Sequence, residues 1–467
     1  MSRSTRGSGH VMRRFHFTAA IALAVCSLAV AVASQAQPRS KPSVERAYQA
    51  FLADKRVTAA LAQIKKEDAR TFAEQVAISQ IPSPSFKEAV RAADYLRRFR
   101  DLGLTDAQID SVGNVVARRK GTGRGPTLVL SAHLDTVFPE GTDVTVRETN
   151  SRFEGRGLSD DARGLAVLIE VLRAMQDNGI RTSGDVLFVG TVGEEGLGNL
   201  RGVKGLFRDH AGIDGFISVD SVDPPGGDQG GNTVISQATG SRRWTLVFRG
   251  PGGHSFEDFG APSAVHAMGR AIASISDLRP PAEPKATFTV GVVTGGTAIN
   301  AIAAEAQMQV DIRSNSTEAL LALERDILAA AEQAVARENA RWGSKEMSLE
   351  RKLMGDRPAG VAHNDRPVVQ AALRSAAALN LPIPRLVAGS SDSNVPLALG
   401  IPAATLSGGG EGAKFHSPDE WYKPVNAWLG PQSVLLTTLA LVGLDGISQP
   451  TLVRGVSGRN RSSTGDR

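Results

Sequence analysis

Cysteine and aromatic residues are scarce in this sequence. Cysteine occurs once in 467 residues, at Cys26 inside an apolar N-terminal run, and aromatic residues make up only 5%. Because that run has the character of a signal segment, we expect a mature chain without disulfide bonds or thiol chemistry. No basic face with interleaved aromatic residues occurs, so the sequence lacks the usual surface of a nucleic-acid-binding protein. We therefore expect no nucleic-acid partner.

Long apolar runs are also missing, except near the N-terminus, where "TAAIALAVCSLAVAVA" spans residues 18–33. Four arginines and no acidic residue precede this run, and "AVASQAQ" offers cleavage after Ala33 or Ala36. The pattern predicts a signal peptide over residues 1–36 and an exported protein, periplasmic or secreted. The run is short for a membrane span, so we expect no membrane association after its removal; a retained N-terminal anchor is the alternative.

Net charge is low once the predicted signal is set aside. The formal charge of +5 includes its four arginines, so the mature chain is close to neutral. With 41% hydrophobic and 22% charged residues, the composition is that of a globular protein large enough for two or three domains. The polar tail at residues 454–467 is expected to be disordered.

Apolar runs alternate with helical periodicity over residues 44–240. A helix is predicted at residues 162–177 from its apolar spacing, and the pattern of helix and strand resumes over residues 357–447. Such alternation predicts an α/β fold in which a mostly parallel sheet carries helices on both faces. The strands expected to be buried in it are at residues 127–132, 185–192, 215–220 and 403–406.

The pattern changes between residues 241 and 356. "RRWTLVFRG" alternates as a strand and "PSAVHAMGRAIASISDL" is helical; two more strands, a long helix and "KEMSLERKLM" follow. The order β-α-β-β-α-β is that of a ferredoxin-like unit. We therefore predict an inserted α+β domain over residues 241–356, which would act as a lid.

Potential metal ligands follow the ends of the predicted parallel strands. Open α/β sheets build their sites at the carboxyl ends of strands, so these side chains should meet at one edge. They are His133, Asp135, Asp160, Asp161, Glu194, Glu195, Asp220 and His416. Each alone has an ordinary explanation, such as a helix cap or a turn. Together, imidazoles and carboxylates without cysteine favour a site for Zn²⁺, Co²⁺ or Mn²⁺.

Motifs across residues 70–445 resemble those of one enzyme family. "SAHLDTV", "GRGLSDDARGLA", "GTVGEEGLG", "GPGGHS", "GGTAINAIAAEAQMQVDIR" and "KFHSPDEW" occur in this order. They are similar to the motifs of the co-catalytic metallopeptidases that include peptidase T, carboxypeptidase G, acetylornithine deacetylase and aminoacylase. The resemblance implies two divalent metal ions, with Zn²⁺ expected and Co²⁺ or Mn²⁺ compatible.

The resemblance also implies how the ligands divide. One ion would be held by His133 and Asp220 and the other by Glu195 and His416, with Asp160 bridging both. Two ions about 3.5–4 Å apart can share a water and lower its pKa toward about 7.

Two further acidic residues would have catalytic roles by the same resemblance. Asp135 would orient His133, and Glu194 would act as the general base, passing the water's proton to the leaving amine. Adjacent acids suit separate tasks, because a ligating carboxylate has fewer lone pairs left for proton transfer.

The resemblance assigns the remaining candidates to substrate contacts. His254 would reach the site of a neighbouring subunit and support the oxyanion, which implies a homodimer formed through the inserted domain. Asn300 and Arg313 would bind the substrate carboxylate, and the backbone at Gly409 would line the cleft. Each residue also has a purely structural alternative. His254 would be a histidine in a turn and Asn300 an amide in a loop. Arg313 would be a charged residue at the end of a strand, and Gly409 a glycine that shapes a turn.

One position departs from the family pattern. Many relatives carry a lysine after the acidic pair, whereas this chain has Ala162 and Arg163. Asp160 is intact, so we expect the departure to affect subfamily assignment rather than metal binding.

The sequence predicts an exported di-metal hydrolase that cleaves the amide bond of a short peptide, dipeptide or N-acyl amino acid. A biosynthetic deacylase of the acetylornithine or succinyl-diaminopimelate type is an alternative, which export opposes because those substrates are cytoplasmic. A catalytically silent peptide-binding relative is another, opposed by Glu194. A third is a single-chain aminopeptidase without a lid, opposed by the pattern of residues 241–356.

Overall fold

The computed structural model of the protein describes residues 41–123, 125–226 and 233–455. The predicted signal peptide, Cys26 and nearly all of the predicted tail lie outside these described residues. Among the described helices, none combines the length and the apolar character needed to span a membrane.

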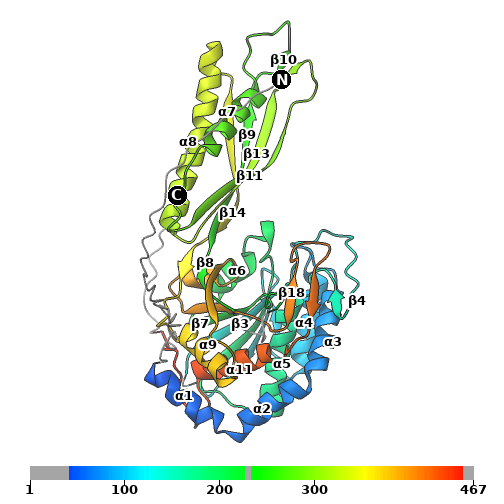
Figure 1. Ribbon diagram of the computed structural model, residues 1–467, viewed down its shortest axis with the longest axis vertical. Helices are drawn as coiled ribbons and strands as arrows, with labels where there is room; N and C mark the ends of the chain where they lie inside the picture. The colour runs from blue at the N-terminus through cyan, green and yellow to red at the C-terminus, as the bar shows by residue number, and fades with distance from the viewer. Residues whose placement is uncertain (1–40, 124, 227–232, 456–467) are drawn as a thin grey trace, which may run out of the picture. The chain divides into compact units, whose positions relative to one another are not determined.

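A mixed nine-stranded sheet forms the centre of the fold (Figure 1). Its strands are β1 (Gln108–Ile109), β2 (Val115–Arg119), β3 (Thr127–His133), β6 (Asp185–Thr191), β7 (Gly215–Val219), β8 (Thr233–Ala238), β15 (Gly360–Val361), β16 (Arg385–Gly389) and β17 (Ala403–Leu406). They run in the order β1-β2-β6-β3-β7-β17-β8-β15, and β16 pairs with β8. The central neighbours β6, β3, β7 and β17 are all parallel, which confirms the predicted fold class.

Helices cover both faces of this sheet. They are α1 (Pro42–Leu52), α2 (Lys55–Lys66), α3 (Asp68–Ser79), α4 (Ala89–Asp101), α5 (Ala162–Asp177), α6 (Arg201–Asp209), α9 (Pro367–Ala378), α10 (Asn394–Ala398) and α11 (Leu429–Val442). Along β3, Leu128 and Leu130 belong to one hydrophobic cluster and Val129 to another on the opposite face. Burial on both faces explains why the strand is a continuous apolar run.

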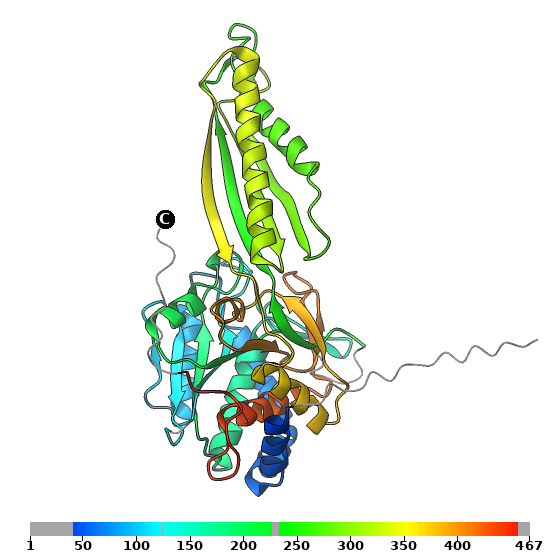
Figure 2. The same ribbon diagram turned by 90° about the vertical axis from the view of Figure 1, so that its left-hand side faces the viewer.

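The inserted segment forms a second, four-stranded antiparallel sheet. Its elements are β9 (Gly240–Arg249), α7 (Ala264–Ser276), β11 (Ala286–Gly295), β13 (Glu305–Ser314), α8 (Thr317–Trp342) and β14 (Ser348–Arg357), and its strand order is β11-β13-β9-β14. Alternate residues of β9 and β13, among them Phe248 and Met308, are buried with residues of α7 and α8 in a separate core. Both helices lie along one face of this sheet (Figure 2). The element order is that of the ferredoxin-like unit expected from the sequence.

A small sheet joins two segments that are distant in the sequence. Its strands are β4 (Arg147–Thr149), β5 (Arg152–Glu154), β18 (Glu411–Ala413) and β19 (Trp421–Lys423), in the order β18-β19-β5-β4. The pairing of β19 with β5 places the turn that carries His416 beside the segment that leads to Asp160. The sequence patterns did not predict this sheet, because its strands are only three residues long.

Candidate metal centre and substrate pocket

Neighbouring parallel strands deliver the predicted ligands to one edge of the central sheet. His133 is the last residue of β3 and pairs in register with Thr191, the last residue of β6. Glu194 and Glu195 lie in the loop that begins after β6, and Asp220 directly follows β7 on the other side of β3. The predicted convergence at the carboxyl ends of these strands is what the structure shows.

Asp160 lies between two histidines. Its Oδ1 is 2.8 Å from Nε2 of His133, and its Oδ2 is 3.0 Å from Nε2 of His416. Nε2 of His416 is also 3.0 Å from Oε1 of Glu195. One carboxylate therefore connects both imidazoles, which is the arrangement that a bridging ligand requires.

The ligand atoms fall into two overlapping groups that fit two cations. One group is His133, Asp160 and Asp220; the other is Asp160, Glu195 and His416. Within each group the ligand atoms lie within 4.8 Å of one another, compatible with metal–ligand bonds of about 2.0–2.2 Å. Glu194 also forms a compact group with His133 and Glu195. The imidazole and carboxylate donors suit a divalent ion of the zinc type.

The candidate ligands place several buried carboxylates close together, and positive charge nearby would stabilise their ionised forms. Burial and repulsion from Asp160 raise the pKa of Glu195 to about 7, and burial raises the pKa of Asp220 well above its usual value. Hydrogen bonds with Asp160 and Glu195 raise the pKa of His416 to about 10. Without a metal, protons therefore supply the charge that offsets these carboxylates. Divalent ions would displace those protons on binding.

Asp135 connects His133 to the acidic pair. Its buried carboxylate accepts hydrogen bonds from the backbone N–H groups of Glu194 (2.9 Å) and Glu195 (3.1 Å) and from Oγ of Ser85 (2.6 Å). Its backbone oxygen lies 3.0 Å from Nδ1 of His133, and its Oδ1 lies 3.7 Å from the same nitrogen. This position suits the orienting role expected for Asp135.

The two acids at the start of α5 have different partners. Asp160 faces the histidines, whereas Asp161 caps the helix by accepting a hydrogen bond from the N–H of Gly164 at 3.0 Å. The other oxygen of Asp161 accepts from the backbone N–H of His133 at 3.0 Å. The helix-cap explanation thus holds for Asp161 but not for its neighbour.

Glu420 is a buried residue that the sequence reasoning did not single out. Its Oε2 accepts a hydrogen bond from the N–H of Gly157 (2.9 Å), and its Oε1 accepts from those of Ser159 (2.8 Å) and Asp160 (3.2 Å). It lies four positions after His416, so its hydrogen bonds connect the turn that carries His416 to the segment that carries Asp160. Its place in the "KFHSPDEW" motif was the available signal.

Arg163, the residue that departs from the family pattern, has hydrogen-bond partners outside the candidate ligand set. It is fully buried and donates hydrogen bonds to the backbone oxygens of Gly408 (2.8 Å) and Ala427 (2.6 Å). It therefore stabilises the glycine-rich turn after β17. Gly409 in that turn does not line the pocket described below: its φ is +79°, and its oxygen accepts from the hydroxyl of Tyr422. The expected substrate contact of Gly409 stays a prediction, and its positive φ is also what a turn glycine would show.

A pocket of about 340 Å³ opens over the candidate metal centre. Asp160, Glu194, Glu195, Asp220 and His416 line one part of it. Three arginines contributed by β9, β13 and β14 line another part: Arg243, Arg313 and Arg357. The predicted substrate residue Arg313 is therefore placed at the pocket, and the other two arginines were not foreseen.

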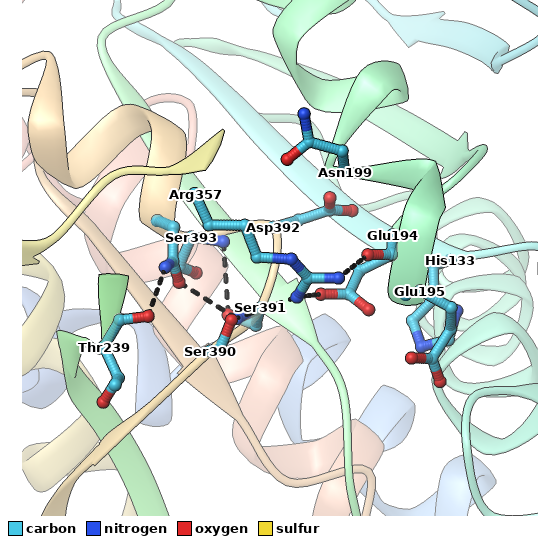
Figure 3. A network of polar contacts seen from close by, with 12 residues as sticks. His133, Glu194, Glu195, Asn199, Thr239, Arg357, Ser390, Ser391, Asp392 and Ser393 are labelled. Carbon is cyan, nitrogen blue, oxygen red and sulfur yellow. Dashed lines mark hydrogen bonds and ion pairs between the residues drawn. The ribbon is translucent and has the colours of Figure 1, made fainter. Parts of the chain in front are cut away.

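A polar network lies beside Glu194, the candidate general base (Figure 3). Arg357 contacts Glu194 and donates a hydrogen bond to Oγ of Ser390 at 3.0 Å. The adjoining loop carries Asp392, which is buried and accepts a hydrogen bond from the hydroxyl of Thr191. Burial raises the pKa of Asp392 to about 7.

His254 and Asn300 lie together on the inserted unit, away from the pocket lining. His254 is in β10 (Gly253–His254), which pairs with β12 (Ala301–Ile302), and the backbone oxygen of Asn300 accepts a hydrogen bond from the N–H of Ser255 at 3.0 Å. Both side chains are exposed, and neither lines the pocket of its own chain. Their expected contacts with substrate stay predictions.

Comparison with known proteins identifies relatives across most of the chain. The model of "Peptidase family M20/M25/M40" matches residues 129–440. The uncharacterised protein YqjE of Bacillus subtilis is 27% identical over 362 residues, which cover 75% of this chain and 92% of that protein. Carboxypeptidase G2 of Pseudomonas sp. is 31% identical over 103 residues, 21% of this chain and 25% of that enzyme.

Solved structures show the same fold. A tripeptidase from Staphylococcus aureus superposes with a TM-score of 0.66 at 24% identity and covers 79% of this chain and 97% of its own. A Bacillus subtilis protein described as a dinuclear metal binding peptidase from the M20 family gives a TM-score of 0.58 at 18% identity, covering 80% and 98%.

Proposed function

Because the chain belongs to peptidase family M20/M25/M40, we propose that it is an exported two-metal hydrolase of short peptides, dipeptides or N-acyl amino acids. Family membership makes it a hydrolase of peptides or amino-acid derivatives.

The position of Asp160 between His133 and His416 is the observation that carries the proposal. A carboxylate with one oxygen toward each imidazole, flanked by further acids, suits two cations that share a ligand. When bound, two divalent ions, with Zn²⁺ expected, would polarise the scissile carbonyl and lower the pKa of a water toward about 7.

The chain's own residues supply the remaining chemistry. Glu194 lines the pocket beside the ligands and would accept the proton of the attacking water, then deliver it to the leaving nitrogen. Arg357 holds the Glu194 carboxylate at one oxygen. Asp135 would keep His133 in its ligating orientation.

The pocket supports a small substrate with a free carboxylate. Its volume of about 340 Å³ lies at the small end of ligand sites. Arg313 lines it, and a guanidinium binds carboxylate by paired hydrogen bonds. The Staphylococcus aureus neighbour is described as a tripeptidase, and a yeast neighbour with a TM-score of 0.64 is described as a dipeptidase.

A deacylase-type hydrolase is the second candidate. A putative [LysW]-lysine/[LysW]-ornithine hydrolase of Pyrococcus furiosus is 34% identical over 127 residues, 27% of this chain and 34% of that protein. The N-terminal signal pattern over residues 1–36 opposes it, because biosynthetic substrates of this kind are cytoplasmic.

We further propose a homodimer formed through the inserted unit. His254 and Asn300 are exposed on that unit and do not reach the pocket of their own chain. In a dimer they would complete the pocket of the partner subunit, where His254 would support the oxyanion.

A substrate screen tests the proposal. Purified mature protein with added Zn²⁺, Co²⁺ or Mn²⁺ is expected to hydrolyse members of a panel of dipeptides and N-acetyl amino acids. Chelation should abolish the activity, and readdition of the ion should restore it. Full activity in protein shown by elemental analysis to be free of metal would contradict the two-metal assignment.

A further inference from the structure

We propose that Arg243 acts together with Arg313 as the binding site for the substrate carboxylate, and that Asp311 holds the two guanidinium groups in position. This inference rests on the proposed function, since it specifies how the same pocket recognises its substrate. The expected site contained Arg313 and Asn300 only, and Asn300 lies elsewhere.

Strand geometry places the three side chains on one face. Arg243 of β9 is the register partner of Asp311 of β13, and Arg313 is two residues further along the same strand. Residues two apart on a strand share a face, and directly opposed residues share a face with each other. All three side chains therefore project from the same side of the sheet, and both arginines line the pocket.

Asp311 contacts both arginines at the same nitrogen, Nε. Its Oδ1 is 3.1 Å from Nε of Arg243, and its Oδ2 is 2.7 Å from Nε of Arg313. Nε is therefore the nitrogen of each guanidinium group that donates a hydrogen bond to Asp311. A planar guanidinium held at one edge is oriented as a whole, since its donors form a rigid fork.

Several donors remain for a ligand. Nη1 of Arg243 donates to the backbone oxygen of Gly196 at 2.6 Å. Within the part of the chain that the structure describes, no protein acceptor contacts Nη2 of Arg243 or either Nη of Arg313. These three nitrogens are therefore available to donate hydrogen bonds to the carboxylate of a substrate, with one arginine on each side of it.

The local charge matches a single anionic group. Asp311 offsets one of the two positive charges, which leaves one for a ligand. The third arginine, Arg357, is already paired with Glu194. Burial, and then repulsion from Arg357, lowers the pKa of Arg243, so an anion beside it would relieve an unfavourable environment.

Gly196 connects this site to the metal centre. It follows the ligand Glu195 directly, so the contact from Arg243 fixes the carboxylate site relative to a metal ligand. That contact would determine how far the hydrolysed amide lies from the substrate carboxylate. Arg243 is thus a specificity-determining residue, whereas Asp311 is a positioning residue.

Paired substrates provide the test. The best substrate of the wild-type protein and its carboxamide analogue would be assayed with wild type, Arg243→Ala, Arg313→Ala and Asp311→Asn. Arg243→Ala should raise KM for the free carboxylate roughly 10–100-fold, the factor expected for lost charge-assisted hydrogen bonds, and leave KM for the amide nearly unchanged. Asp311→Asn should act in the same direction but less strongly.

A matched control separates recognition from general charge effects. Arg249 is on the same strand but is exposed and pairs with Glu305 and Glu350, so Arg249→Ala should leave both KM values unchanged. Arg243→Lys keeps the charge without the fork and should give an intermediate KM. Thermal melting of each variant checks that the fold is retained.

The outcomes distinguish the inference from the proposed function. A wild-type protein that hydrolyses no free-carboxylate amide would overturn the function itself. A wild-type preference for the free carboxylate that Arg243→Ala leaves intact would overturn only the role of Arg243. Equal losses on both substrates would show that Arg243 shapes the pocket rather than binding the carboxylate.

Discussion

Arg357 donates a hydrogen bond from Nη1 to Oε1 of Glu194 over 2.9 Å, and its Nη2 donates to the backbone oxygen of the same residue. Both side chains are buried, with 5% and 6% of their surfaces exposed. Arg357 is the last residue of β14, so the candidate base is held by the strand through which the chain leaves the inserted unit.

Arg357→Met should impair both stability and turnover. Removing one partner of a buried ion pair leaves the other charge unpaired, which typically costs about 3–5 kcal/mol of the free energy of unfolding. Metal content should stay normal, since Arg357 contacts none of the five candidate ligands in the described structure. Denaturant unfolding, kcat and elemental analysis would check this. Arg357→Lys is the control, and an unchanged kcat in the Met variant would remove Arg357 from catalysis.

The two adjacent glutamates should respond differently to the same change. Glu194→Gln is expected to keep its metal and lose about 10²–10⁴-fold in kcat, the usual contribution of a general base. Glu195→Gln should lose metal instead, because Glu195 contacts His416 in one of the ligand groups. Elemental analysis of both variants decides the assignment, and the reverse pattern would exchange the two roles.

Glu420→Gln should weaken metal binding without removing a ligand. Three backbone N–H groups point at the carboxylate, and the amide nitrogen of glutamine cannot accept their hydrogen bonds. We expect metal affinity to fall about 10–100-fold, as for other groups that orient ligands, measured by titration calorimetry. Asp419→Asn, at an exposed neighbouring residue, is the matched control. Equal affinities for the Gln variant and wild type would contradict the positioning role.

Asp392 should make the metal-free protein less stable as pH rises. Burial, with repulsion from Glu194, raises its pKa from 3.8 to about 7, so the native state holds this proton more tightly than the unfolded chain does. The contribution, on the order of 4 kcal/mol, is present below about pH 4 and is lost as pH rises through about 7. Denaturant unfolding at several pH values should give a shallower decline for Asp392→Asn. Identical declines would refute the assignment.

The proposed dimer predicts complementation between inactive variants. In a mixed dimer of Glu194→Ala and His254→Ala subunits, the second subunit keeps its base and receives His254 from the first. Random mixing should therefore restore roughly a quarter of wild-type activity, since half of the dimers are mixed and each has one complete site. Activity after co-refolding, beside each variant alone, is the measurement. No recovery would place His254 outside the partner's site.

The sequence was most informative where a regular pattern is repeated over many residues. The helix predicted at residues 162–177 is α5 with the same bounds, and the apolar runs of the parallel strands located the strand ends that carry the ligands. Because neighbouring parallel strands end at the same edge of the sheet, the residues that follow them lie close together in space. The sequence could therefore predict that ligands as far apart in the chain as His133 and His416 would meet.

Contacts that depend on a single side chain gave no such signal. Glu420, Asp311 and Arg357 each act through a partner distant in the chain or across a sheet, and nothing periodic marks them. For Gly409, too, the sequence predicts a turn but not which side of that turn faces the pocket, so its contact with substrate stays a prediction.

A single carboxylate standing between two imidazoles also limits how the centre can be redesigned. Asp160 gives one oxygen to each half, so any replacement there damages both halves at once. A one-ion variant of the proposed two-metal centre would therefore need a substitution at a ligand that belongs to only one of the two groups, Asp220 or His416.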